Sequence, residues 1–223
     1  MSNYYFKLKP LLGIKTISIF FGALFLTSCS SNIYVGIDKV ADLDTPGIIN
    51  SNIAIGVLDA RATKVDDSLG ASYLGKSYTL TGSHEIHTIN HEDLGNHLAA
   101  RLADSARKSG LSPQVVSLNS IYDVSVASRK LVDTNAPKSL LLVIHRLDID
   151  GGYSIKVDYK FSLYAFGKST QNFRQRTVNT QRTIVGNILS PTSSASRNIE
   201  IEIADSIQAL LHSEPIMSKL EEF

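Results

Sequence analysis

A strict alternation of apolar and polar residues between 153 and 165 constrains the fold of this chain more than any other stretch. Odd positions from Tyr153 to Ala165 are all apolar, whereas even positions from 154 to 162 carry serine, lysine or aspartate. Side chains of a β-strand point alternately to its two faces, so this strand should bury one face and expose the other. Gly151-Gly152 suits a tight turn before it, and the apolar run at 140–144 opens the preceding strand.

Five further segments have the pattern of strands. The continuous apolar run at 53–58 is typical of a strand buried on both faces. Residues 72–80 and 84–89 predict a loose hairpin, and residues 114–118 predict a short strand. Residues 173–185 carry many polar side chains, which suits an edge or exposed strand.

Three segments have the periodicity of helices. One is expected between Asn90, as its N-cap, and Gly110, where a left-handed residue ends helices. A weaker helix is expected at 119–132 with Ile121 on its inner face, and a final helix buries Ile199 and the isoleucines that follow it at helical spacing. The resulting order predicts an α+β fold, in which a mostly antiparallel sheet with a three-stranded C-terminal meander packs against two or three helices.

The N-terminus has the pattern of an export signal. Lys7, Lys9 and Lys15 give the first residues a positive charge without any acid, and the apolar run at 16–29 is too short to cross a bilayer as a permanent helix. The alternatives are an ordinary transmembrane anchor, or a soluble protein with an apolar N-terminus. Cys29 ends this run and is the only cysteine, so no disulfide can form within the chain.

The end of the apolar run, Leu26-Thr27-Ser28-Cys29, resembles the bacterial lipobox. This resemblance implies that the Cys29 sulfur takes a diacylglycerol, that residues 1–28 are removed as a lipoprotein signal peptide, and that fatty acids such as palmitate anchor the new N-terminus. We expect an acylated N-terminus and tether at 29–52 and a single α+β periplasmic domain at 53–223. Ser30, rather than aspartate, follows the cysteine and implies the outer membrane.

The order of elements, behind the lipobox and with the LLLVI strand at 140–144 before the meander, resembles the YajG family of bacterial lipoproteins. More distantly it is similar to the auxiliary lipoproteins of envelope lipid-transport ABC systems. Neither family has a catalytic motif that maps onto this chain. The resemblance therefore implies an accessory or binding role in the envelope, with no catalytic residue, cofactor or metal.

Charge argues against nucleic acid as a partner. Residues 1–28 contain three lysines and no acids, so their removal would leave 19 bases against 21 acids, a net charge of −2. Binding to nucleic acid needs a clustered basic surface. Arg174, Arg176 and Arg182 would share one face of the strand at 173–185, where they could meet lipid phosphates or simply protect a sheet edge.

Residues 70–77 match the phosphate-loop pattern G-x-x-x-x-G-K-[ST] in full. That site needs a buried strand leading directly into the loop and a helix beginning at the lysine. Here Asp59–Leu69 separates the strand at 53–58 from Gly70, and the residues after Ser77 favour a strand or turn. A glycine-rich surface loop is the expected structure.

Four of the six histidines, His84, His87, His91 and His97, lie within fourteen residues. This density suggests a metal site, but the H-E-x-x-H spacing of a zinc helix is absent, and a solvated loop is the favoured interpretation. There is no G-x-S-x-G elbow, and His145 and Asp148 do not share a strand face.

The functional expectation is a lipid-anchored, non-enzymatic binding or assembly module on the periplasmic side of the outer membrane. Its partners would be the membrane, through the N-terminal lipid, and an envelope protein. An auxiliary subunit of a lipid-transport or secretion complex is the alternative. A metal-dependent hydrolase that uses the His84 to His97 cluster is a third hypothesis.

Overall fold

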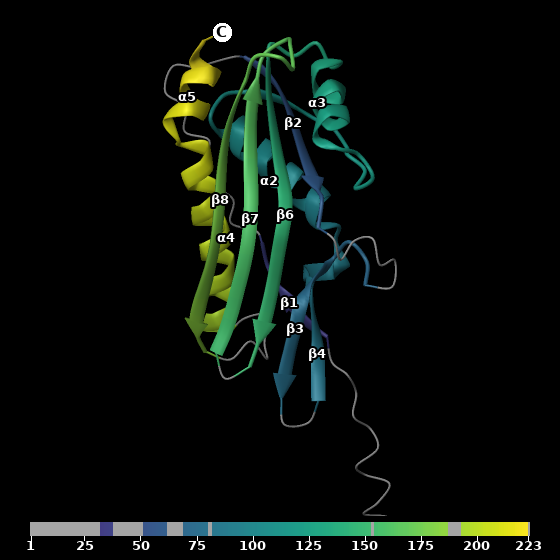
Figure 1. Cartoon of the computed structure of the whole chain (residues 1–223), viewed down its shortest axis with the longest axis vertical. Helices are drawn as coiled ribbons and strands as arrows, with labels where there is room; N and C mark the ends of the chain where they lie inside the picture. The colour runs from purple at the N-terminus through teal and green to yellow at the C-terminus, as the bar shows by residue number, and fades with distance from the viewer. Residues whose placement is uncertain are drawn as a thin grey trace, which may run out of the picture. The chain divides into compact units, whose positions relative to one another are not determined.

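The computed structural model describes residues 32–37, 51–61, 69–79, 82–152, 154–186 and 193–222. These residues form eight strands, four α-helices and one short 3-10 helix (Figure 1). In chain order the elements are β1 (Ile33–Val35), β2 (Asn52–Asp59), β3 (Tyr73–Thr79), β4 (Gly82–Thr88), η2 (Ile89–His91), α2 (Leu94–Lys108), β5 (Ser112–Val115), α3 (Val124–Val132), β6 (Lys138–Gly151), β7 (Ser154–Phe166), β8 (Phe173–Val185), α4 (Ser194–Leu211) and α5 (Glu214–Glu221).

The sheet is arranged around the long strand β6 (Figure 1). One edge of β6 pairs with β7 along nearly its whole length, antiparallel, from Ser139 to Gly151. The other edge is shared by two parallel strands, since β2 lies beside residues 138–144 and β3 beside residues 149–151. The sheet therefore forks at β6: β2 continues to β5, while β3 continues to β4 and β1.

The predicted α+β class and C-terminal meander are confirmed. The hairpin β3–β4 and the meander β6–β7–β8 are antiparallel and include the longest pairings, and β8 spans the predicted residues 173–185. The pairings β1–β4, β2–β5, β2–β6 and β3–β6 are parallel, so the sheet is mixed.

Helices cover both faces of the sheet. The larger core joins the odd positions of β2 and β7 to α2, α4 and α5, while α3 packs on the opposite face against Leu141 and Val143 of β6. A bulge between Ile144 and Arg146 shifts the phase of β6. Even positions up to Ile144 face the larger core before the bulge, and odd positions such as Ile149 face it afterwards.

The predicted starts of two helices are wrong. Asn90 lies in η2 with a φ of 60°, and the cap of α2 is Asp93, whose Oδ1 accepts a hydrogen bond from the Asn96 amide at 2.9 Å. The second helix, α3, begins only after Asp123 caps it. Ile121 therefore lies outside that helix and is 82% exposed rather than buried.

The segment expected to be a tether contains a strand. Ile33 and Val35 of β1 are buried, as is Ile37 after it, and β1 adds to the sheet beside β4. Three residues are too few to show a periodicity, so the sequence did not reveal this strand. The sheet consequently begins four residues after Cys29, which itself lies outside the described residues.

Gly75 should be essential for stability. Its φ is +151°, and a Cβ at this position would lie 2.0 Å from the carbonyl oxygen of Ile149 in the neighbouring strand. We expect Gly75→Ala to lower the free energy of unfolding by about 3 kcal/mol or more in urea denaturation followed by circular dichroism. Gly152→Ala is the control, because the nearest atom to its Cβ is Ser154 O at 3.9 Å. Equal losses from both variants would contradict this explanation.

Candidate functional site

The phosphate-loop pattern does not form a phosphate loop. Gly70 lies in the turn before β3, whereas Gly75, Lys76 and Ser77 lie within that strand, and the next element is the strand β4 rather than a helix. Backbone N–H groups of a strand are engaged by its neighbours and do not converge on an anion. The second glycine of the pattern allows β3 to pack closely against β6.

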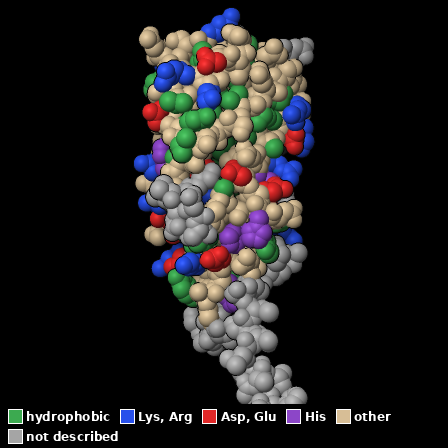
Figure 2. All heavy atoms as spheres, turned by 90° about the vertical axis from the view of Figure 1, so that its right-hand side faces the viewer, with side chains coloured by type: hydrophobic (Ala, Val, Ile, Leu, Met, Phe, Trp, Pro, Cys, Tyr) green, Lys and Arg blue, Asp and Glu red, His purple; other side chains and the backbone are tan. Residues whose placement is uncertain are grey.

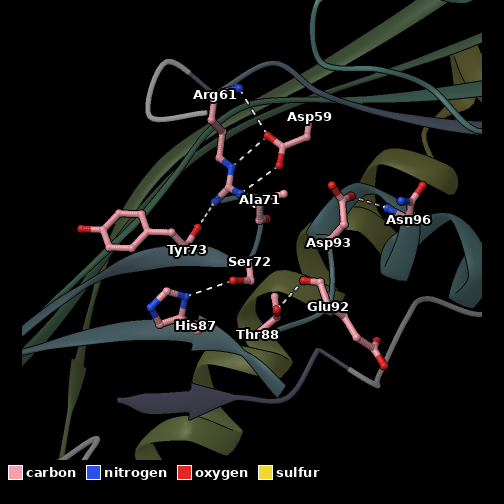
Figure 3. A network of polar contacts seen from close by, with 10 residues as sticks. All are labelled: Asp59, Arg61, Ala71, Ser72, Tyr73, His87, Thr88, Glu92, Asp93 and Asn96. Carbon is pink, nitrogen blue, oxygen red and sulfur yellow. Dashed lines mark hydrogen bonds and ion pairs between the residues drawn. The ribbon is translucent and has the colours of Figure 1, made fainter. Parts of the chain in front are cut away.

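A buried ion pair stands at the fork of the sheet (Figure 3). Asp59 ends β2, and its carboxylate accepts hydrogen bonds from Arg61 Nε at 2.9 Å and Nη2 at 2.8 Å. Arg61 also donates from Nη1 to the carbonyl of Tyr73 at 2.6 Å and from Nη2 to that of Ala71 at 3.2 Å. The guanidinium therefore joins the end of β2 to the start of β3, and with 4% and 2% exposure Arg61 and Asp59 are fully enclosed.

Two of the predicted histidines gather around one hydroxyl group. Ser72 Oγ lies 3.0 Å from His87 Nδ1 and 3.5 Å from His91 Nδ1, and the two imidazole rings are 4.7 Å apart. His87 is buried, and its Nε2 lies 3.2 Å from Glu85 Oε2. Histidine side chains reach the surface on the side of the molecule that carries the β3–β4 hairpin (Figure 2).

The other contacts of these histidines hold the N-terminal strand in place. His91 Nε2 lies 2.9 Å from the Tyr34 hydroxyl, and the two rings meet edge to face. His97, on α2, forms an ion pair with Glu92 and places Nε2 3.1 Å from the carbonyl oxygen of Ile37. These two histidines thus attach β1 and the segment that follows it to η2 and α2.

The geometry gives the metal-hydrolase hypothesis no support. Within the described part of the chain, no group of three or more histidine, cysteine, aspartate or glutamate side chains is placed to hold a metal ion. His97 is turned towards Ile37 and Glu92, away from the pair that His87 forms with His91. The Tyr73 ring lies beside His87. Burial, together with the charges of Asp148 and Glu85, raises the pKa of the Tyr73 hydroxyl to about 12.

The best candidate for a binding site is a cavity of about 390 Å³ between α3, the end of β7 and the start of β8. Tyr164, Phe166 and Phe173 provide its aromatic walls, and the rings of Tyr164 and Phe173 lie 5.8 Å apart. Its size and mainly apolar lining are those of small-ligand sites. The remaining lining residues are Val124, Ser125, Ser128, Arg129, Thr170 and Gln175.

One positive charge lies at this cavity. Arg129 of α3 is exposed, and it is the only lysine or arginine among the described residues that line the cavity. Burial raises the pKa of the Tyr164 hydroxyl, which therefore stays neutral at physiological pH. The site combines aromatic surface with one cation, an arrangement that suits an apolar ligand with an anionic group.

Sequence reasoning missed this cavity, although it carried a signal. The even positions of β7 are polar from Ser154 to Ser162, and then Tyr164 and Phe166 break the alternation. Two aromatic side chains on the otherwise polar, solvent-facing side of a strand indicate that another element covers that side or that a ligand binds to it. Here α3 covers it in part.

The remaining candidate residues are separated. His145 is the bulged residue of β6, with Nε2 3.0 Å from Ser162 Oγ, and burial together with the charge of Lys160 lowers its pKa. Arg174, Arg176 and Arg182 lie opposite Ala165, Leu163 and Val157 of β7, so they share one face of β8, as predicted. Arg182 forms an ion pair with Glu202 of α4 at 3.3 Å. No helix among the described residues has the length and hydropathy needed to span a membrane.

Comparisons with known proteins define the fold but not a family. No family model and no curated protein sequence matches this chain. The protein XCC0632 of the DUF330 family from Xanthomonas campestris matches with a TM-score of 0.53 and 10% identity over 86% of this chain and 98% of its own. The two chains therefore share a fold.

Two weaker matches are the PelC dodecamer from Paraburkholderia phytofirmans and lipoprotein GNA1162 from Neisseria meningitidis. PelC has a TM-score of 0.38 and 12% identity over 78% of this chain and 93% of its own. GNA1162 has a TM-score of 0.31 and 6% identity over 74% and 99%. Both scores are below the level at which folds are equated. The resemblance to the YajG family is not confirmed by these matches and stays a prediction.

The ion pair at the fork should contribute strongly to stability. Arg61→Met leaves the buried Asp59 carboxylate without its main partner, so we expect the free energy of unfolding to fall by about 3–5 kcal/mol in urea denaturation. Arg107→Met is the matched control, because Arg107 pairs with Asp104 on the exposed surface of α2, where such a pair contributes about 0.5 kcal/mol. The explanation fails if the two variants lose the same stability.

Proposed function

We propose that this chain is a lipid-anchored lipoprotein on the periplasmic side of a bacterial outer membrane, where it acts as a binding or assembly module without catalytic activity. The observation that carries the proposal is the lipobox-like sequence Leu26-Thr27-Ser28-Cys29, which follows a basic, acid-free segment and an apolar run. The sheet begins shortly after it, at Ile33, so a mature protein that starts at Cys29 would retain every described element.

The cavity supports a binding role. Apolar walls from β7, β8 and α3 line a space suited to part of an apolar ligand, and Arg129 can pair with an anionic group of that ligand. We propose that this cavity takes an amphiphilic anion such as a fatty acid or the acyl end of a lipid. This binding chemistry favours, as the second candidate, an auxiliary subunit of an envelope lipid-transport or secretion complex.

The anchor is tested by mass spectrometry of the protein purified from bacterial membranes. We expect the mature chain to begin at Cys29 and to carry diacylglycerol and an amide-linked fatty acid. Cys29→Ser should retain residues 1–28 and carry no lipid, whereas the control Ser31→Ala should be processed normally. An intact Met1, or an unmodified cysteine at the mature N-terminus, would refute the anchor.

The cavity is tested with a fluorescent fatty acid, cis-parinaric acid, and its methyl ester. Phe173→Ala removes one aromatic wall and should weaken binding of both probes about tenfold, as expected for the loss of a buried aromatic contact. Arg129→Gln should weaken binding of the acid but not of the ester. Tyr78→Ala is the control, since Tyr78 is an exposed aromatic residue on β3, outside the cavity. Absence of saturable binding, or equal affinities for all variants, would exclude this ligand class.

A further inference from the structure

The direction of β1 determines which end of the sheet the N-terminal anchor approaches. β1 is parallel to β4, and Ile33 lies beside Ile86. The chain therefore enters β1 from the side of the earlier residues of β4, a strand that begins at Gly82, opposite Thr79 at the end of β3 (Figure 1). The turn between β6 and β7 lies at the same end, because Ser77 of β3 is beside Gly151.

The connection from the anchor to the sheet is very short. Four residues separate Cys29 from Ile33, and a fully extended chain of that length spans at most about 14 Å. Gly82 and Ile86 are also four residues apart along β4, a distance of about 14 Å in a strand. The four residues that join Cys29 to Ile33 therefore span no more than the part of β4 between Gly82 and Ile86.

We propose that the β3–β4 hairpin end of the domain rests on the surface of the lipid bilayer, held there by the short connection to acylated Cys29. This inference rests on the proposed acylation. It replaces the expected long tether at 29–52 with a fixed orientation, in which the hairpin end faces the lipid headgroups and the cavity between α3, β7 and β8 lies at the opposite end of the sheet.

The exposed side chains at the hairpin end suit a membrane surface. Tyr78, near the end of β3, is 59% exposed, and Lys76 on the same strand is also exposed. Val185 ends β8 at the same level of the sheet, beside Ser154, and is 87% exposed. Tyrosine and lysine are residues that place an apolar body at the interface and a polar tip in the headgroup layer.

Several contacts keep the connection short. Ile33, Val35 and Ile37 are all buried in the larger core, so release of β1 would expose three large apolar side chains to water. The Tyr34 hydroxyl near His91 adds a polar contact to the same strand, as described above. β1 therefore belongs to the folded sheet and does not lengthen the tether.

The orientation can be measured by fluorescence, because Cys29 is the only native cysteine and would be acylated. Ser83→Cys places a thiol near the start of β4, at the hairpin end, and Ser169→Cys places one in the β7–β8 turn at the other end. Both serines are exposed. Each acylated variant is labelled with bimane and reconstituted into phosphatidylcholine vesicles that contain lipids with a nitroxide headgroup.

We expect the nitroxide lipids to quench bimane emission at least about twofold at position 83 and to leave it unchanged at position 169, some 35 Å away along β7. Insertion of about twelve glycine and serine residues between Ser31 and Asn32 adds about 20 Å of average reach and should relieve the quenching at 83. Equal emission from both labels overturns the proposal, and so does quenching at 83 that survives the insertion. Mass spectrometry of the same samples separates the two proposals: loss of acylation refutes the anchor, whereas equal emission from acylated protein refutes only the orientation.

Discussion

Backbone pairing along both edges of β6 is the interaction on which the rest of the structure depends. β7 pairs with one edge. The other edge pairs first with β2 and further along with β3, and between these two partners the bulge at His145 shifts the phase of the strand. At this change of partner the Arg61 side chain joins the end of β2 to the carbonyls of Ala71 and Tyr73 at the start of β3. A single buried guanidinium thus bridges the gap that a forked sheet creates, and this explains why such a costly charge is enclosed there.

Elements that bury one regular face could be predicted from the sequence, whereas long-range pairings could not. The alternation in β7 and the polar strand β8 follow from the two-residue period of a strand, and both lie where the sequence places them. The parallel partners of β6 come from distant parts of the chain, and nothing local specifies them. The three-residue strand β1 is too short to show a period. The N-cap of α2 is Asp93 instead of the predicted Asn90, because asparagine and aspartate both suit a cap and the sequence alone does not choose between them.

The candidate site shows the same limit. The density of histidines suggested a metal, but strand pairing places Tyr34, Tyr73 and His87 side by side on β1, β3 and β4, and the polar atoms of this cluster are used to hold strands together. The cavity needs α3 to lie over Tyr164 and Phe166, an arrangement that no spacing in the sequence encodes. Only the break in alternation at those two aromatic residues pointed to it.

The two proposals together constrain how a ligand would reach the cavity. With the hairpin end on the bilayer, the aromatic cavity lies at the other end of β7, about 35 Å from the headgroups. A lipid or fatty acid in the anchoring leaflet would have to leave the bilayer and cross water to enter it, which exposes its apolar chain and is strongly unfavourable. If the ligand is a bilayer lipid, this orientation favours delivery by a partner that shields it, and binding at the cavity and association with another envelope protein would then be two parts of one function.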